Sequence, residues 1–274
     1  MEENIQDKPE GSLEEQQTPD FVPPVTNIQN ISLSDSLAGV FSEPGETFTE
    51  IKKSTKGSYW IWPIIILAVI TAFSSFIVMN DEELSSEIKT MQSKAMKEKL
   101  DEVVKSGQMT REQADEQIEK AQSMMGGGLF AVIGVAGGVI SVLIFFFVKG
   151  LIYWGGFKIF KGTATFVNIM NVLGIASIIT SIQMILDTVL AIFTGRLYIN
   201  IGPVLFFTEE AVGKSMYKFI ANFDLINIWY LVIIAIGFAK VSDLKSSVTF
   251  PMVFGLWLIW VILTSFVTTS FLGF

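Results

Sequence analysis

The chain has 274 residues, of which 50% are hydrophobic and 17% are charged, well below the quarter or so of charged residues in soluble domains. It contains neither cysteine nor histidine, which excludes disulfides, the usual zinc and haem ligands and a Ser-His-Asp triad. We therefore expect no cofactor, and any metal would need oxygen ligands alone. The net charge of −8 argues against a nucleic-acid partner, since phosphate binding needs a basic face.

The first 45 residues are acidic and rich in Glu, Gln, Pro, Ser and Asn. They lack the basic start and the apolar core of a signal peptide. Such a composition predicts a disordered acidic tail over 1–45 on the cytoplasmic side. Its hydrophobic patch at 31–41 has two interpretations, a short docking helix or part of a tether that contacts nothing specific, and the pattern favours the tether.

A basic amphipathic stretch follows at 46–56. A short helix on the membrane surface would insert Phe48 and Ile51 into lipid. Each lysine near anionic headgroups adds about 1 kcal/mol of attraction. The compatible alternative is a positive flank that only fixes orientation. The lysines predicted to contact the membrane surface are Lys52, Lys53 and Lys56.

Five apolar stretches come near the ~20 residues that a helix needs to cross ~30 Å of hydrocarbon. Only a helix hides its backbone polar groups in lipid without closing a barrel. We therefore expect an all-α polytopic membrane helix bundle with five transmembrane helices, which together with the linking segments form one membrane domain over 46–274. The predicted spans lie at about 59–79, 129–148, 172–193, 219–239 and 250–271.

The fourth of these spans is short. Its strictly apolar part, 225–239, covers only about 22 Å at 1.5 Å per residue. Either the helix begins near Phe219, or Asp224 caps a short helix where the bilayer thins. The length favours capping by Asp224, at the outer interface.

The segment 80–125 between the first two spans is soluble and highly charged. Ser106-Gly107 would end a first helix, and the capping box from Thr110 to Gln113 would begin a second. This pattern predicts an extracytoplasmic helical hairpin. Its apolar positions suggest packing between the arms or against a second copy, in a homo-oligomer, rather than ligand binding.

Three polar residues of the third span, Thr180, Gln183 and Asp187, fall on one helix face at spacings i, i+3 and i+7. An acid inside a span is costly and usually faces the bundle interior or water. Asp187 is therefore the best candidate for a functional ionisable group. Because it lies near the end of the span, the alternative is a hydrated acid at the interface.

Three glycines are predicted to let helices approach closely. Gly134 and Gly138 form a small-xxx-small pair in the second span, a spacing that favours helix packing in membranes. Gly237 lies inside the fourth span, before its polar exit. We interpret all three as packing positions within the fold.

The distribution of basic residues predicts the orientation. Short loops rich in Lys and Arg stay in the cytoplasm, and bases cluster before span 1, between spans 2 and 3 and between spans 4 and 5. Five spans then place the amino terminus in the cytoplasm and the carboxyl terminus outside. The hairpin at 80–125 faces outward.

Several short motifs occur in order along the chain: Glu43-Pro44 with Phe48, Lys161–Phe166, Val172–Ala176, Phe223–Trp229 and Ala235–Gly237. This ordered set resembles the Yip1 domain family in its bacterial branch, over about Phe41 to Phe274, and the resemblance implies a bacterial inner membrane. The long charged hairpin departs from that pattern, since the core domain does not require it. The resemblance implies five spans with a cytosolic amino tail; eukaryotic relatives help recruit prenylated small GTPases, but no GTPase-binding residues carry over here.

These observations favour a non-enzymatic integral membrane protein that organises the membrane or recruits partner proteins. Its partners would be the lipid bilayer and unidentified membrane or cytosolic proteins. A small transporter or channel component with a polar path around Asp187 is the alternative. No catalytic residues are assigned, because the membrane domain offers only Asp187 and Asp224, on different spans, where intramembrane chemistry needs clustered groups.

Overall fold

The computed structural model describes residues 30–125, 128–197 and 199–267, and every regular element within them is a helix. The expectation of disorder for residues 1–29 falls outside this range. Five helices are long and apolar enough to span a membrane, which confirms the predicted all-α bundle. They are α3 (Ile61–Asn80), α6 (Gly128–Ile159), α7 (Phe166–Thr194), α10 (Leu225–Ser242) and a continuous segment, Ser246–Phe266, that comprises α11 (Ser246–Ile262) and most of the π-turn η2 (Leu263–Val267).

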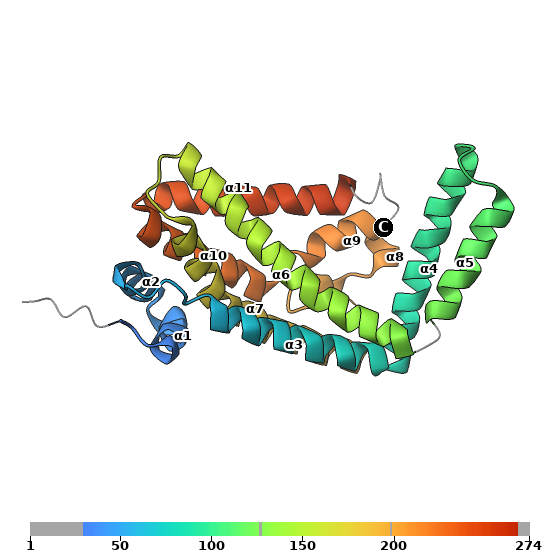
Figure 1. The fold of residues 1–274 in the computed structure, drawn as a ribbon, viewed down its shortest axis with the longest axis horizontal. Helices are drawn as coiled ribbons and strands as arrows, with labels where there is room; N and C mark the ends of the chain where they lie inside the picture. Colours follow the sequence, from blue (N-terminus) through green and yellow to red (C-terminus); the bar gives the residue numbers. More distant parts are fainter. Residues whose placement is uncertain (1–29, 126–127, 198, 268–274) are drawn as a thin grey trace, which may run out of the picture.

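The spans lie side by side, with the remaining helices at their two ends (Figure 1). At one end lie α1 (Leu33–Ser42) and α2 (Pro44–Lys53). At the opposite end α4 (Glu82–Lys105) and α5 (Arg111–Met125) pack against each other and project from the bundle. Near them lie the short elements that join α7 to α10: η1 (Pro203–Phe206), α8 (Glu209–Val212) and α9 (Lys214–Ala221).

Helix α7 occupies the centre of the bundle and contacts α3, α6 and α10. Its first half is almost completely enclosed, with Ile169, Ile175 and Ile179 each 0% exposed. Helix α6 is peripheral, with most of its apolar side chains at the surface, as expected of a helix that faces lipid. The hydrophobic core therefore lies around the first half of α7.

Three helix boundaries differ from those expected. Helix α6 has 32 residues, about 48 Å at 1.5 Å per residue, so Lys149 lies within a helix rather than in a loop. Helix α7 begins at Phe166 because the Thr165 hydroxyl accepts a hydrogen bond from the Asn168 amide, at 3.2 Å. Helix α10 begins at Leu225, where Asp224 accepts from the Asn227 amide at 2.8 Å, which confirms capping by Asp224.

Helices α1 and α2 correct two expectations about the region before span 1. The patch at 31–41 is no free tether: it forms most of α1, and Val40 within it is 0% exposed in the core. The apolar residues of α2 do not insert into lipid either. Phe48 and Ile51 are 0% and 3% exposed because they pack inside the protein, where α2 contacts α10 and α7.

One residue at the end of α10 joins three segments, in what we call the Asp243 junction (Lys52, Thr163 and Asp243). Lys52 Nζ donates to Asp243 Oδ1 at 2.5 Å, and Thr163 Oγ1 donates to Oδ2 at 2.6 Å. The Thr163 amide also donates to the Ser242 carbonyl at 3.0 Å. The Lys52 ammonium, followed by the Thr163 hydroxyl, holds the pKa of the Asp243 carboxyl below its ordinary value. Lys52 thus binds the protein, while Lys53 and Lys56 remain exposed.

Glycines mark the closest helix contacts. The Trp60 backbone crosses α7 at Gly174, where an added Cβ would lie 2.4 Å from Trp60 Cα. At Gly237 a Cβ would lie 2.6 Å from Val172 Cγ1 and 2.8 Å from the Phe48 ring. Gly134 and Gly138 both lie against α3, beside Met79 and Ser75 respectively. Small residues at these positions let neighbouring helices approach closely.

We expect Gly174→Ala to destabilise the fold by about 1–3 kcal/mol, the usual cost of overpacking a tight core. The new methyl group would collide with backbone atoms of Trp60, which cannot rotate away. Unfolding in detergent micelles, followed by circular dichroism, measures the loss. Gly137→Ala in α6 is the control, because nothing lies within 4 Å of its added Cβ, and it should be neutral or slightly stabilising. Equal effects of the two substitutions would contradict this packing.

The Asp243 junction predicts a pH dependence. A carboxyl whose pKa is lower in the folded state stabilises the fold above its unfolded-state pKa, and that contribution is lost as the pH falls through the folded-state value. Asp243→Asn should therefore cost up to about 1 kcal/mol near neutral pH, since the pair is partly exposed, and progressively less below about pH 4. Asn also tolerates the left-handed conformation of this residue, φ +60°.

Melting temperatures of the two proteins across this pH range test the prediction. Glu119→Gln, which changes an exposed acid of α5, serves as control and should match the parent at every pH. A loss in Asp243→Asn that is the same in acid as at neutral pH would contradict the assignment.

Candidate functional site

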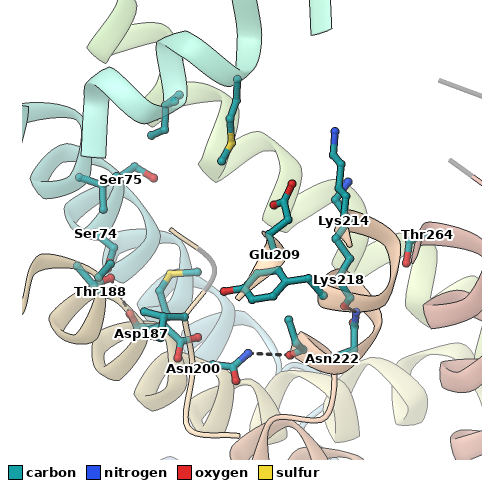
Figure 2. A pocket seen from close by; sticks show the side chains of 18 of the residues that line it. Ser74, Ser75, Asp187, Thr188, Asn200, Glu209, Lys214, Lys218, Asn222 and Thr264 are labelled. Carbon is teal, nitrogen blue, oxygen red and sulfur yellow. Dashed lines mark hydrogen bonds between the residues drawn. The ribbon is translucent and has the colours of Figure 1, made fainter. Parts of the chain in front are cut away.

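A cavity of about 1130 Å³ lies between the second half of α7 and the hairpin helix α4. Its walls also include the end of α3, the α7–α10 connection and η2 (Figure 2). Polar groups line its inner end, charged groups lie around α8 and α9, and apolar side chains come mainly from α3, α4 and α7. We take this cavity as the candidate site, because polar and apolar side chains from several helices converge on it.

The three polar residues predicted on the third span all line this cavity: Thr180, Gln183 and Asp187. Helical periodicity places them on one face of α7. They follow the tightly packed first half of the helix and face the cavity. Asp187 is half-buried, and its Oδ1 atom is enclosed without a hydrogen-bond partner in the described structure. A carboxylate oxygen without a partner is costly to bury, which makes Asp187 the most unusual group of the wall.

The segment after α7 brings a second polar group to Asp187. Asn200 is 9% exposed, and its Nδ2 donates to the Ala221 carbonyl at 2.7 Å. Its Oδ1 has no partner within the described residues. Figure 2 shows the Asn200 amide next to the Asp187 carboxylate, with the bond from Nδ2 drawn as a dashed line.

Asp224 adds a third oxygen close to this pair. It is 1% exposed; Oδ1 caps α10, and Oδ2 has no partner that the structure describes. Gly202 explains the close approach, because a Cβ there would lie 3.0 Å from Asn200 Oδ1 and 3.2 Å from Asp224 Cα. We call Asp187, Asn200 and Asp224 the oxygen cluster.

Both signs of charge occur where α8 and α9 meet the cavity. Glu209, Lys214 and Lys218 contribute to the lining, and Figure 2 shows them across the cavity from Asp187. Burial, and to a smaller extent the neighbouring Lys214, lower the pKa of the Lys218 ammonium group. Arg196 supports this wall by donating to the Tyr217 hydroxyl at 3.0 Å. These groups can attract a charged or polar ligand to the cavity.

The hairpin contributes an apolar wall. Ile88 and Met91 of α4 line the cavity opposite Met184 of α7. Methionine adapts its shape to varied partners and is common at promiscuous binding surfaces. Further along the hairpin, Leu100 and Ala114 are buried, at 9% and 1% exposed. Ile88 and Met91 thus form part of a candidate binding surface. The sequence alone suggests only packing between the hairpin arms or against a second copy for the apolar positions of the hairpin.

The other residues singled out from the sequence lie outside this cavity. Lys52 belongs to the Asp243 junction at the α1–α2 end of the bundle, and Lys56 Nζ lies 5.5 Å from the centre of the Tyr59 ring. The glycines lie at helix contacts. Sequence reasoning missed Asn200 as a site residue and gave Asp224 only a capping role. The one local signal was Gly202-Pro203, a break that allows close backbone approach.

The arrangement offers groups that can bind a polar or charged ligand. The sequence has no cysteine or histidine, and the described residues contain no group of three or more acids placed to hold a metal ion. The inner end of the cavity offers carboxylate and amide oxygens, and its walls offer lysine, glutamate and methionine. Such groups bind cations and amphiphilic surfaces.

Comparisons with known proteins agree with this architecture. The family model described as the Yip1 domain matches residues 38–268. The chain is also similar to the membrane protein YknW of Bacillus subtilis (strain 168), with 22% identity over 218 residues that cover 77% of this chain and 80% of that protein. No solved structure gives a significant match. With a family model that covers most of its length and five helices able to span a membrane, the chain belongs to the Yip1 domain family of integral membrane proteins.

Proposed function

We propose that this Yip1-family protein is a non-enzymatic membrane protein that recruits a partner protein through the cavity beside the α4–α5 hairpin. The observation that supports this most directly is the cavity itself. At about 1130 Å³ it slightly exceeds the ~300–1,000 Å³ of ordinary small-molecule pockets. A protruding segment of another protein fits such a space.

The lining supports a partner with both apolar and charged side chains. Ile88 and Met91 offer apolar contact, while Glu209 and Lys214 offer charges of both signs. Interfaces of this kind gain affinity from a buried apolar centre and specificity from the surrounding polar groups. Helix α4 supplies one wall of the cavity. We therefore assign partner recognition to the α4–α5 hairpin, which the Yip1 core domain does not require.

We propose that this cavity faces the outside of a bacterial inner membrane, with the amino terminus in the cytoplasm. The arrangement of bases supports this orientation. Lys52 of α2 binds Asp243 at the end of α10, and Lys240 lies against Gly45 of α2. Basic residues from separate segments therefore gather at the α1–α2 end, opposite the hairpin, as the positive-inside rule requires of a cytoplasmic face.

Transport along a polar path around Asp187 is a weaker second candidate. The enclosed carboxylate oxygen of Asp187 within a span favours it. The first half of α7 opposes it, because Ile169, Ile175 and Ile179 are fully packed and the lining of the cavity on α7 begins at Thr180. Solute flux in proteoliposomes that Asp187→Asn abolishes would favour transport over recruitment.

Photo-crosslinking tests the recruitment proposal. A benzoylphenylalanine at Met91, inside the cavity, should give an adduct of reproducible size in cells, whereas the same probe at the exposed Glu119 of α5 should not. Ala95→Trp, which fills the cavity from α4, should reduce the Met91 adduct about tenfold, as a loss of about 1.4 kcal/mol in binding would. Lys97→Trp on the same helix, outside the lining, is the matched control. Identical adducts at both probe positions, or no effect of Ala95→Trp, would contradict the proposal.

Cysteine labelling tests the orientation, since the native chain has no cysteine to react. A membrane-impermeant maleimide added to intact cells should label Glu119→Cys on the hairpin at once. Lys53→Cys in α2, equally exposed in the fold, should react only after the membrane is permeabilised. The reverse pattern would place the hairpin in the cytoplasm and overturn the proposed orientation.

A further inference from the structure

We infer that the oxygen cluster binds a monovalent cation, either a sodium ion or the ammonium group of a protonated amine. The cluster consists of Asp187, Asn200 and Asp224, from α7, the α7–α10 connection and the cap of α10 respectively. The sequence places these residues up to 37 positions apart, and only the fold brings their oxygens to one region.

Three oxygens of the cluster lack hydrogen-bond partners among the described residues. Asp187 Oδ1, Asn200 Oδ1 and Asp224 Oδ2 are all enclosed and accept no hydrogen bond from any described residue. Each such atom costs free energy, most of all when it belongs to a carboxylate. Two of the three side chains are at least nine-tenths buried, so bulk water does not satisfy them. Three unpartnered acceptors in one place call for a positively charged ligand.

The remaining atoms of the Asn200 and Asp224 side chains fix the orientation of their free oxygens. Asn200 Nδ2 donates to the Ala221 carbonyl, so the amide oxygen is directed away from that backbone. Asp224 Oδ1 caps α10, so Oδ2 is the oxygen left over. Gly202 lets the two segments meet, because any side chain there would fill the space between Asn200 Oδ1 and Asp224. The acceptors are thus held in place before a ligand arrives.

The chemistry of the oxygen ligands indicates the kind of cation that the cluster binds. Carboxylate and amide oxygens suit hard cations. Calcium takes six to eight oxygen ligands and is commonly held by several carboxylates, but this cluster has two acids, and no set of three metal-binding residues occurs elsewhere in the described chain. Sodium in membrane proteins is commonly held by uncharged oxygens together with few acids, at breaks between helices. A protonated amine can use the same oxygens as hydrogen-bond acceptors.

This inference deepens the proposed function, because it names a ligand class for the same cavity, and it rests on that proposal only for the idea that the cavity is a binding site. A bound cation would neutralise part of the buried charge and hold the inner end of the cavity in one arrangement. The test below uses the purified protein without any partner. Its failure can therefore be distinguished from the failure of the crosslinking experiment.

The experiment measures the melting temperature of the purified full-length protein in detergent at constant ionic strength. Sodium chloride, methylammonium chloride and N-methylglucamine chloride are the three salts compared. A ligand that binds only the folded state raises the melting temperature with its concentration. We expect a saturable rise with sodium or with methylammonium and none with the bulky N-methylglucamine. Whichever of the two small cations gives the rise identifies the source of the positive charge.

Two isosteric variants locate the effect. Asp187→Asn and Asp224→Asn each remove one charge, and asparagine at 224 keeps the helix cap, so both should fold and show at least tenfold weaker cation binding. Glu119→Gln, which changes an exposed acid of α5 that does not line the cavity, should bind as the parent does. Sodium-23 NMR relaxation on the parent protein measures binding without any variant.

Equal melting temperatures in all three salts, with no sodium relaxation effect, would overturn the inference. An unchanged response in both asparagine variants would do so too, because the cation would then bind elsewhere.

Discussion

The close packing of α7 against its neighbours is the constraint on which the rest of the structure depends. Gly174 lets the Trp60 backbone approach α7 directly, and Asn171, 2% exposed, accepts a hydrogen bond from the Trp60 amide at 3.3 Å. Span 1 is therefore fixed at its entrance, and α10 packs on α7 through the contact between Gly237 and Val172. In a bilayer, where apolar burial gives little drive to association, such van der Waals contact holds helices together.

The same helix divides into two halves of different character. The first half is enclosed by apolar side chains on all sides, so it seals the bundle. The second half carries Thr180, Gln183 and Asp187 on one face, which lines the cavity together with residues of α3 and α4. Polar groups in a span are tolerated where they face such a space. The first half of α7 thus packs in the core of the bundle, and its second half lines the cavity. The hairpin then bounds the open side.

The spans and Asp187 could be predicted because their signals are local. Length and hydropathy identify a membrane helix, and a spacing of three and four residues places polar groups on one face. The docking of α1 and α2 could not, because the amphipathic pattern of Phe48 and Ile51 is the same whether the apolar face meets lipid or protein. Asn200 was missed for a related reason: its neighbours in space come from α7 and α10, and a loop asparagine carries no periodic signal.

The Asp243 junction has a consequence for biosynthesis. Lys52 and Asp243 are separated by 191 positions, so α2 leaves the ribosome long before its binding surface on α10 exists. Until span 4 is inserted, Phe48 and Ile51 have no protein surface to cover them and must be held by lipid or by a chaperone. The entropy of closing so long a loop grows only slowly with its length, so docking becomes favourable once the spans assemble. Helix α2 can therefore attach in this way only after span 4 is in place.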